Sequence, residues 1–232
     1  MSEFENIIAE QFFFVKALRN GDNKRAVVLR HKALGTQLVV REFCGDITVY
    51  DKLCAVSHPN LPKVYSAEQV GDRCKVVEEY INGITVADVL AGSVYTESGV
   101  RSVAKSICAA LDTLHSLNII HRDIKPENVM VDSDGEVKLI DFDAARIYKA
   151  YQPQDTLFIG TAGFAAPEQY GISQSDPRSD IFALGIMMNV MLTGEHPSKQ
   201  LYRGKLTKII EKCINIDPNK RFGSAKELYG KL

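Results

Sequence analysis

The stretch that most constrains the fold lies at residues 121–143. It opens with a polar run from His121 to Asn128 (HRDIKPEN), and two strand-like runs, 129–131 and 137–140, follow on either side of an Asp-Gly turn. Short runs of strand formers around such a turn predict a β-hairpin. The hairpin would bring Asp123, Asn128 and Asp141 together at one end.

The run HRDIKPEN, followed by Asp-Phe-Asp at residues 141–143, resembles the catalytic loop and metal-binding turn of protein kinases. A lone His-Arg-Asp has little weight, because such residues are usually ordinary loop residues, but the complete run with correctly spaced Asp-Phe is far more specific. The resemblance implies an α+β, two-lobed protein kinase-like fold. Residues 1–80 would form a small, antiparallel, β-rich N-lobe with a reduced helix, and residues 81–232 a mainly helical C-lobe.

By this resemblance the chain is expected to be a protein serine/threonine kinase that uses ATP and Mg²⁺. Asp123 would orient the acceptor hydroxyl and Lys125 would neutralise the γ-phosphate, while Asn128 and Asp141 would hold the metal. ATP would bind between the lobes.

The run from Gly160 to Glu168 is similar to the G-T-x-x-Y-x-A-P-E segment of serine/threonine kinases. It implies that Thr161 bridges Asp123 and Lys125. In the preceding activation segment, Thr156 is the favoured phosphorylation site and Tyr151 a less favoured one; an added phosphate there could pair with Arg122.

The resemblance also implies a supporting set. Asp180 would accept backbone N–H bonds from the catalytic loop, and Glu168 would pair with Arg221. The supporting residues are His121, Arg122, Phe142, Glu168, Asp180 and Arg221.

The predicted nucleotide-binding residues lie mostly before residue 82, where the resemblance is weaker. They are Gly21, Val39, Arg41, Glu79, Ile81 and Met130. Gly21 is the one glycine kept in the phosphate-covering loop, since Arg19 and Lys24 stand at the flanking positions. These two are interpreted as solvated hairpin residues, the alternative being side-chain contacts to phosphate.

Arg41 stands where the family has a strand lysine, and a planar guanidinium is not equivalent to an ammonium. Val49 occupies the position of the lysine's glutamate partner, so Asp46 is one candidate partner for Arg41. Glu78 falls behind the adenine position, where a desolvated carboxylate needs a partner, and Arg41 is the candidate. A one-residue misalignment is the alternative. Whether Arg41 is natural or an inactivating substitution stays open.

Asp143 replaces the glycine of the metal-binding turn. Because a Cβ and a charge restrict the backbone, the turn is expected to favour one conformation. A role for Asp143 as a further metal ligand is the less favoured interpretation.

Further patterns predict helices of the C-lobe. Thr85 to Asp88 has the form of a capping box, and Thr96 opens a longer helix with one apolar face. The apolar run 181–192 is too short to span a bilayer, which takes about 20 residues, and predicts a buried core helix.

Composition narrows the remaining classes. A net charge of −1 gives no reason to expect nucleic acid or a membrane surface as a partner. Five widely spaced cysteines, with no CxxC pair, indicate free thiols and a cytoplasmic protein, and no signal peptide is visible.

Two functions stay open at this point. The first is phosphoryl transfer from ATP to a protein substrate or to the chain itself. The second is a non-catalytic kinase-like (pseudokinase) module that binds a nucleotide or a partner, which the altered residues at positions 41, 49 and 143 favour.

Overall fold

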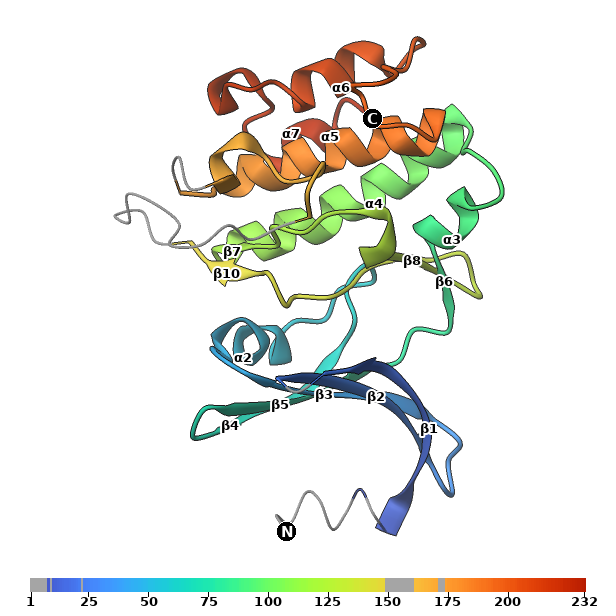
Figure 1. The fold of residues 1–232 in the computed structure, drawn as a ribbon, viewed down its shortest axis with the longest axis vertical. Coiled ribbons are helices and arrows are strands. Elements are labelled where there is room, and N and C mark those ends of the chain that lie inside the picture. Colours follow the sequence, from blue (N-terminus) through green and yellow to red (C-terminus); the bar gives the residue numbers. More distant parts are fainter. Residues whose placement is uncertain (1–7, 9, 22, 149–160, 171–173) are drawn as a thin grey trace. The chain divides into compact units, whose positions relative to one another are not determined.

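The computed structural model describes residues 8, 10–21, 23–148, 161–170 and 174–232 (Figure 1). Contacts divide the chain into two compact units, one made of residues 1–58 and 62–81 and the other of residues 59–61 and 82–232. The first unit holds an antiparallel sheet with a short helix, and the second is mainly helical. This confirms the predicted α+β class.

The first unit is built on a sheet whose described strands have the order β1-β2-β3-β5-β4. The predicted strands at residues 11–18, 26–29 and 37–43 are present as the first three. The elements are β1 (Phe12–Asn20), β2 (Lys24–His31), β3 (Gln37–Cys44), α2 (Thr48–Cys54), β4 (Val64–Val70) and β5 (Arg73–Glu79).

Both faces of this sheet are apolar at its centre. Successive side chains of a strand point to opposite faces, so consecutive apolar residues contribute to both. One face carries a buried cluster of Val27, Leu29, Val40 and Val77. The opposite face carries other buried residues of β2, β3 and β5, namely Ala26, Val28, Val39 and Val76.

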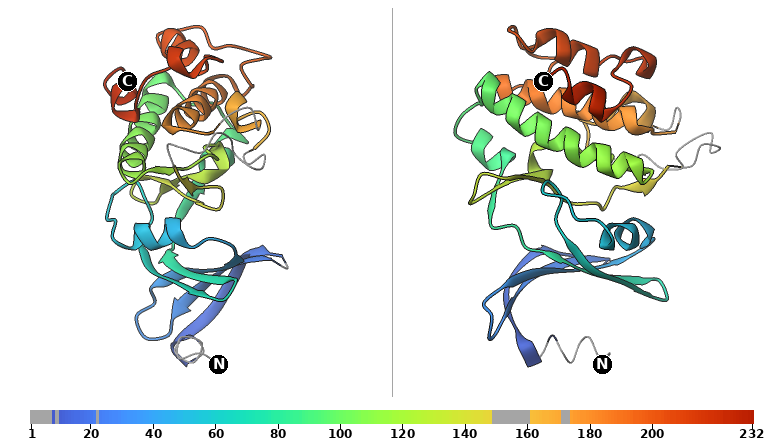
Figure 2. Two further views of the ribbon diagram at one scale, coloured as in Figure 1. Left: turned by 90° about the vertical axis from the view of Figure 1, so that its left-hand side faces the viewer. Right: turned by 180° about the vertical axis from the view of Figure 1, so that it is seen from behind.

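Helix α2 covers this second face. The ring of Tyr50 in α2 lies 5.6 Å from that of Phe43, whose side chain shares a face with those of Val39 and Arg41. Val49 and Leu53 are also buried, whereas Asp51 is exposed. Figures 1 and 2 show α2 lying over the sheet near β4.

The second unit has short strands around its polar loops and a group of helices. Its elements are β6 (Gly83–Thr85), α3 (Val86–Leu90), α4 (Glu97–Ser116), β7 (Ile119–Ile120), η1 (Pro126–Asn128), β8 (Val129–Asp132), β9 (Val137–Leu139), β10 (Arg146–Ile147), η2 (Pro167–Tyr170), α5 (Pro177–Thr193), α6 (Thr207–Cys213), η3 (Pro218–Lys220) and α7 (Ala225–Tyr229).

Helices α4 and α5 form the core of this unit and run side by side in both views (Figures 1 and 2). The apolar face predicted for α4 is fully buried, and α5 is the predicted buried helix. The capping box from Thr85 to Asp88 is present, and the side chain of Thr96 caps α4. Among the described residues, no helix is long and apolar enough to cross a membrane.

The predicted hairpin is formed by β8 and β9. The Asp132 carboxylate accepts the N–H groups of Asp134 and Glu136, both at 2.9 Å. Gly135 lies at φ 86°, a conformation that glycine adopts without strain. Asn60 borders β9, since its amide donates to the Val137 carbonyl at 2.8 Å and its own carbonyl accepts the Leu139 N–H at 2.9 Å.

The predicted ion pair between Glu168 and Arg221 is present and buried. The guanidinium donates to the two Glu168 oxygens at 2.6 and 2.9 Å. It also donates to three backbone carbonyls, those of Arg178, Asn215 and Ile216. A guanidinium has five N–H donors, so all of them are used. The pair therefore connects η2, the start of α5 and the segment before η3.

Helices α5 and α6 approach closely at Gly185. A Cβ built on Gly185 would lie 2.4 Å from the Cβ of Cys213 and 2.9 Å from a methyl of Ile214. Real carbon atoms do not approach so closely in a packed core, so a side chain here would push the helices apart.

We expect Glu168→Ala to lower the free energy of unfolding by about 3–5 kcal/mol, because it leaves a buried guanidinium without its counter-charge. The matched control is Glu195→Ala, which removes an exposed pair with Lys199 and should cost at most about 0.5 kcal/mol. Urea denaturation of both variants measures the difference. Equal effects would contradict a stabilising role for the buried pair.

We expect Gly185→Ala to lower the free energy of unfolding by about 1–3 kcal/mol through overpacking. Gly92→Ala is the control, since its nearest neighbour would lie 3.8 Å from the new Cβ. Thermal denaturation of the pair checks this, and an unchanged Gly185→Ala midpoint would disprove the close packing of α5 and α6.

Candidate functional site

The catalytic-loop residues predicted from the sequence are held by the buried carboxylate of Asp180. This carboxylate accepts the backbone N–H of His121 at 3.0 Å and that of Arg122 at 2.7 Å. It also accepts a hydrogen bond from His115 Nε2 at 2.8 Å. Burial would raise the pKa of Asp180, but the bonds and charge from His115 outweigh it and hold the pKa below its ordinary value. The loop is thus anchored to α5 by an ionised carboxylate.

The loop backbone is strained where it turns toward Asp123. Arg122 has φ 69° and Asp141 has φ 66°, in the left-handed region that side-chain-bearing residues rarely adopt. Gln169 supports this turn, since its amide donates to the Arg122 carbonyl at 2.9 Å and its oxygen accepts the Ala166 N–H at 3.0 Å. Such strain persists only where surrounding bonds enforce it, and it gathers at functional sites.

His121 fills the space beneath the loop as a neutral imidazole. Burial lowers the pKa of this side chain despite the nearby carboxylates. Its Nε2 lies 3.2 Å from the Ile140 carbonyl and its Nδ1 accepts the Asp123 N–H at 3.4 Å, which places the proton on Nε2. Its ring lies edge-on to Phe142 at 5.4 Å. His121 and Phe142 thus pack together behind the site.

Asp123, Lys125 and Thr161 form one connected group. The Thr161 hydroxyl donates to Asp123 Oδ1 at 2.6 Å and accepts from Lys125 Nζ at 2.7 Å. The ammonium also lies 2.8 Å from Asp123 Oδ2. This is the bridge that the sequence predicted for Thr161. It connects the loop to residues 161–166, which follow the predicted activation segment.

The same contacts set the charge of Asp123. Partial burial would raise its pKa, but hydrogen bonds from Lys125 and Thr161, with the charge of Lys125, outweigh this and keep the pKa below its ordinary value. Asp123 is therefore a carboxylate at neutral pH, able to accept a hydrogen bond from a substrate hydroxyl.

Asn128 and Asp141 lie on neighbouring backbones. The Asn128 amide donates to both the carbonyl and Oδ2 of Asp123 at 2.9 Å, so its own oxygen is the atom suited to a cation. The N–H of Ile140 donates to the Asn128 carbonyl at 2.9 Å, which brings Asp141 beside this amide.

This donor set fits Mg²⁺. The described part of the chain has no cluster of three or more His, Cys, Asp or Glu side chains that could hold a metal by itself. A metal bound by Asn128 and Asp141 would therefore take its other ligands from outside these side chains. Mg²⁺ is usually bound by one or two carboxylates together with substrate phosphates and water, so an amide oxygen and one carboxylate are an appropriate pair.

The metal-binding turn contains one further contact. The N–H of Asp143 points to Asp141 Oδ1 at 3.4 Å, and Phe142 is buried. The backbone at Asp143 thus braces the Asp141 carboxylate. The expectation that Asp143 biases the turn toward one conformation stays a prediction.

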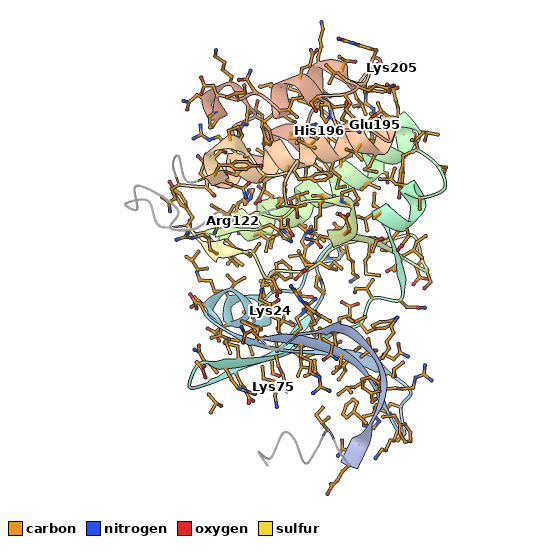
Figure 3. The ribbon with its side chains drawn as sticks, viewed as in Figure 1. Lys24, Lys75, Arg122, Glu195, His196 and Lys205 are labelled. Atoms are coloured by element: carbon orange, nitrogen blue, oxygen red, sulfur yellow. The ribbon has the colours of Figure 1, made fainter. Side chains whose placement is uncertain are left out.

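His196 holds the segment that carries Thr161. The Ser198 N–H donates to His196 Nδ1 at 3.2 Å, so Nε2 carries the proton that bonds the Gly163 carbonyl at 2.9 Å. Figure 3 labels His196 alongside α5 and Arg122 near β7. Sequence reasoning missed His196, Gln169 and His115, because an isolated His or Gln outside a motif gives no pattern.

In the first unit, Arg41 and Glu78 form a buried ion pair. Arg41 Nε donates to Glu78 Oε1 at 2.6 Å, and the two side chains are 13% and 5% exposed. This confirms Arg41 as the partner that Glu78 was expected to need. Asp46, the other candidate partner of Arg41, accepts the Thr48 N–H at 2.8 Å at the start of α2.

The other predicted nucleotide-binding residues are placed as follows. Val39 lies on β3 opposite Glu78, on the same face of the sheet as Arg41. Gly21 follows β1, and its N–H donates to the Lys24 carbonyl at 3.1 Å. Glu79 ends β5, Ile81 is buried, and Met130 of the second unit pairs with Thr85. Thr156 and Tyr151 lie outside the described residues.

Comparisons with known proteins agree with this geometry. The family model described as protein kinase domain matches residues 42–205. The chain is 30% identical over 193 residues to serine/threonine-protein kinase pak-2 of Caenorhabditis elegans, which covers 74% of this chain and 37% of that protein. It is 34% identical over 193 residues to serine/threonine-protein kinase PAK 1 of Mus musculus, covering 74% and 35%.

A third relative, serine/threonine-protein kinase PAK mbt of Drosophila melanogaster, is 36% identical over 140 residues, covering 60% of this chain and 22% of that protein. The chain thus spans between about a fifth and just over a third of the length of these relatives. The family match begins directly after Arg41, so it leaves out β1, β2 and most of β3, where the sequence departs furthest from the kinase pattern. It includes the catalytic loop, the metal-binding turn and Thr161, and on this ground the chain belongs to the protein kinase domain family.

Proposed function

We propose that this protein transfers the γ-phosphoryl group of ATP to serine or threonine hydroxyls of proteins, including its own chain. The observation that carries the proposal is the connected group of Asp123, Lys125 and Thr161. It offers an ionised carboxylate and an ammonium in fixed positions, the two charges that this reaction needs beside the acceptor and the phosphate.

Each residue of this group has a distinct role. Asp123 orients the acceptor hydroxyl and receives its proton as the acceptor oxygen bonds to the γ-phosphorus and the bond to ADP breaks. Lys125 compensates the charge that gathers on the phosphoryl oxygens. Thr161 holds both side chains in position, because its hydroxyl donates to Asp123 and accepts from Lys125. Catalysis of this kind is mainly positioning and electrostatic stabilisation.

Asn128 and Asp141 are the residues that would hold Mg²⁺. When bound, the metal supplies positive charge to the phosphate oxygens and fixes their orientation. The Asp141 carboxylate accepts the Asp143 N–H, and the Asn128 side-chain amide is held by its hydrogen bonds to Asp123.

For the nucleotide we propose the following contacts. The backbone carbonyl of Glu79 and N–H of Ile81 bond adenine, Val39 and Met130 contact its ring, and Arg41 and Gly21 contact the phosphates. We further propose that residues 1–80 and 81–232 act as N-lobe and C-lobe.

Regulation and location are proposed on the same basis. Thr156 is the proposed phosphorylation site of the activation segment. All five cysteines are free thiols, which supports a cytoplasmic protein.

The central test is transfer of labelled phosphate from Mg-ATP to a peptide mixture with Ser, Thr and Tyr acceptors. We expect label on Ser and Thr, and a rate lower by about 100-fold or more in Asp123→Asn, with ATP affinity unchanged within about twofold. The control Asp134→Asn changes an exposed carboxylate of the hairpin turn and should leave the rate unchanged. A rate unaffected by Asp123→Asn would refute the assigned role.

A second test concerns Thr161. Thr161→Val removes the hydroxyl but keeps the shape, and we expect kcat to fall about 10- to 100-fold because Lys125 and Asp123 lose their common partner. Thr161→Ser keeps the hydroxyl and should retain most of the activity. Steady-state kinetics of the two variants check this, and a loss in Thr161→Ser as large as that in Thr161→Val would contradict the role of the hydroxyl bridge.

The alternative function is a non-catalytic module that binds a nucleotide or a partner. The Arg41–Glu78 pair and the buried Val49 favour it, because they replace the lysine and glutamate of the family pattern. Binding of Mg-ATP by the wild type and by Arg41→Lys separates the two. Binding without transfer in both variants would favour the module.

A further inference from the structure

The Arg41–Glu78 ion pair is built entirely within one sheet. Arg41 pairs across the strands with Val76, and Glu78 is two residues further along β5 on the same face. Such diagonal neighbours are within reach of long side chains. The contact joins Nε to Oε1 at 2.6 Å, which is a short, charge-assisted hydrogen bond.

The helix that covers this face offers an apolar surface at the corresponding place. Val49, Tyr50 and Leu53 are the buried residues of α2, and the acidic residue of its first turn, Asp51, is exposed. Strand β5, and not helix α2, therefore supplies the carboxylate that is ion-paired with Arg41 here.

Glu78 is itself held firmly. The next residue, Glu79, donates its N–H to the Lys63 carbonyl at 2.8 Å and accepts the Lys63 N–H through Oε2 at 3.0 Å. On its other side, Val64 of β4 pairs with Glu78. The carboxylate thus projects from the middle of three paired strands and has little freedom to move.

We propose that Glu78 is the positioning residue of Arg41: it fixes the guanidinium for contact with the nucleotide phosphates from within the sheet, without an acidic partner on α2. This inference rests on the proposed function, since it deepens the role of Arg41 there. It explains two departures from the kinase pattern together, because the wide guanidinium and the buried carboxylate compensate each other.

The chemistry of the guanidinium supports this assignment, in which one edge of the group bonds Glu78 and the other donors contact phosphate. Arginine has five N–H donors in a rigid planar fork, and the contact with Glu78 engages Nε. Fixing one edge of the plane fixes the direction of the remaining donors, which suit phosphate oxygens. Lysine has no such second edge, so Arg41→Lys cannot reproduce the arrangement.

The test measures affinity of the full chain for Mg-ATP, Mg-ADP and adenosine by calorimetry, with the melting temperature of each apo variant. Glu78→Gln keeps an acceptor but removes the charge. We expect it to weaken ATP and ADP binding about tenfold, the effect of losing one charge-assisted contact, while adenosine binding stays within about twofold.

The matched control is Glu42→Gln. Glu42 pairs with Lys75 at 3.4 Å across the same two strands, one residue along and on the opposite face. Figure 3 marks Lys75 on the side of the sheet away from Lys24, which agrees with the alternation of the strands. We expect this variant to leave all three affinities unchanged.

A double-mutant cycle guards against variants that fail to fold. Replacing a buried ion pair by apolar residues of similar size is often tolerated, so Arg41→Met/Glu78→Leu should remain folded. In the Arg41→Met background, Glu78→Leu should change the ratio of ATP to adenosine affinity by less than about twofold, since the residue it positions is already gone.

The outcomes are distinguishable. A loss of ATP and ADP affinity without a loss of adenosine affinity in Glu78→Gln supports the inference, provided that Glu78→Leu causes no such loss in the Arg41→Met background. An unchanged affinity ratio with a lower melting temperature would show a purely structural pair and overturn it, as would an equal loss of adenosine binding. A wild type that does not bind Mg-ATP would overturn the proposed function and this inference with it.

Discussion

The second unit depends on one buried carboxylate, that of Asp180. It lies in α5, the most buried of the described helices, and it accepts the N–H groups of two successive loop residues. An ionised group in such a place is tolerated because three donors surround it, including His115 from α4. Two packed helices and the catalytic loop are thereby fixed to one point. The left-handed backbone at Arg122 follows from this constraint.

The contacts of Asp180 are the first of a series that supports the proposed catalytic residues. Asp180 and Gln169 hold the backbone of Arg122, and this backbone directs Asp123 toward Lys125 and Thr161. The Glu168–Arg221 pair in turn holds η2, the element that carries Gln169. The proposed catalytic group of Asp123, Lys125 and Thr161 is therefore supported by side chains from three separate segments, which is the kind of preorganisation that the proposed phosphoryl transfer requires.

The sequence predicted this unit well because its motifs are local. HRDIKPEN, the Asp-Phe turn and the Asp-Gly hairpin each specify a conformation within a few residues, and the capping residues Thr85 and Thr96 set helix starts. Other helix ends are set by less regular contacts: α7 ends at Tyr229, and the Glu227 carboxylate in its first turn accepts the N–H of Gly223, which precedes the N-cap Ser224. Helix ends depend on competing local bonds that sequence patterns do not rank. Contacts that join distant single residues, such as His196 with Gly163 or Gln169 with Arg122, gave no pattern to detect.

The three residues Pro59–Leu61 interrupt the first unit and belong by their contacts to the second. There Asn60 provides the acceptor for the Leu139 N–H and a donor for the Val137 carbonyl, the roles of a neighbouring strand for β9. The strand that delivers Asp141 thus has its edge completed by a segment that lies more than seventy residues earlier in the chain. Neither unit is therefore one continuous segment of the chain. A fragment that starts at residue 82 would lack Asn60 and would leave this edge of β9 exposed.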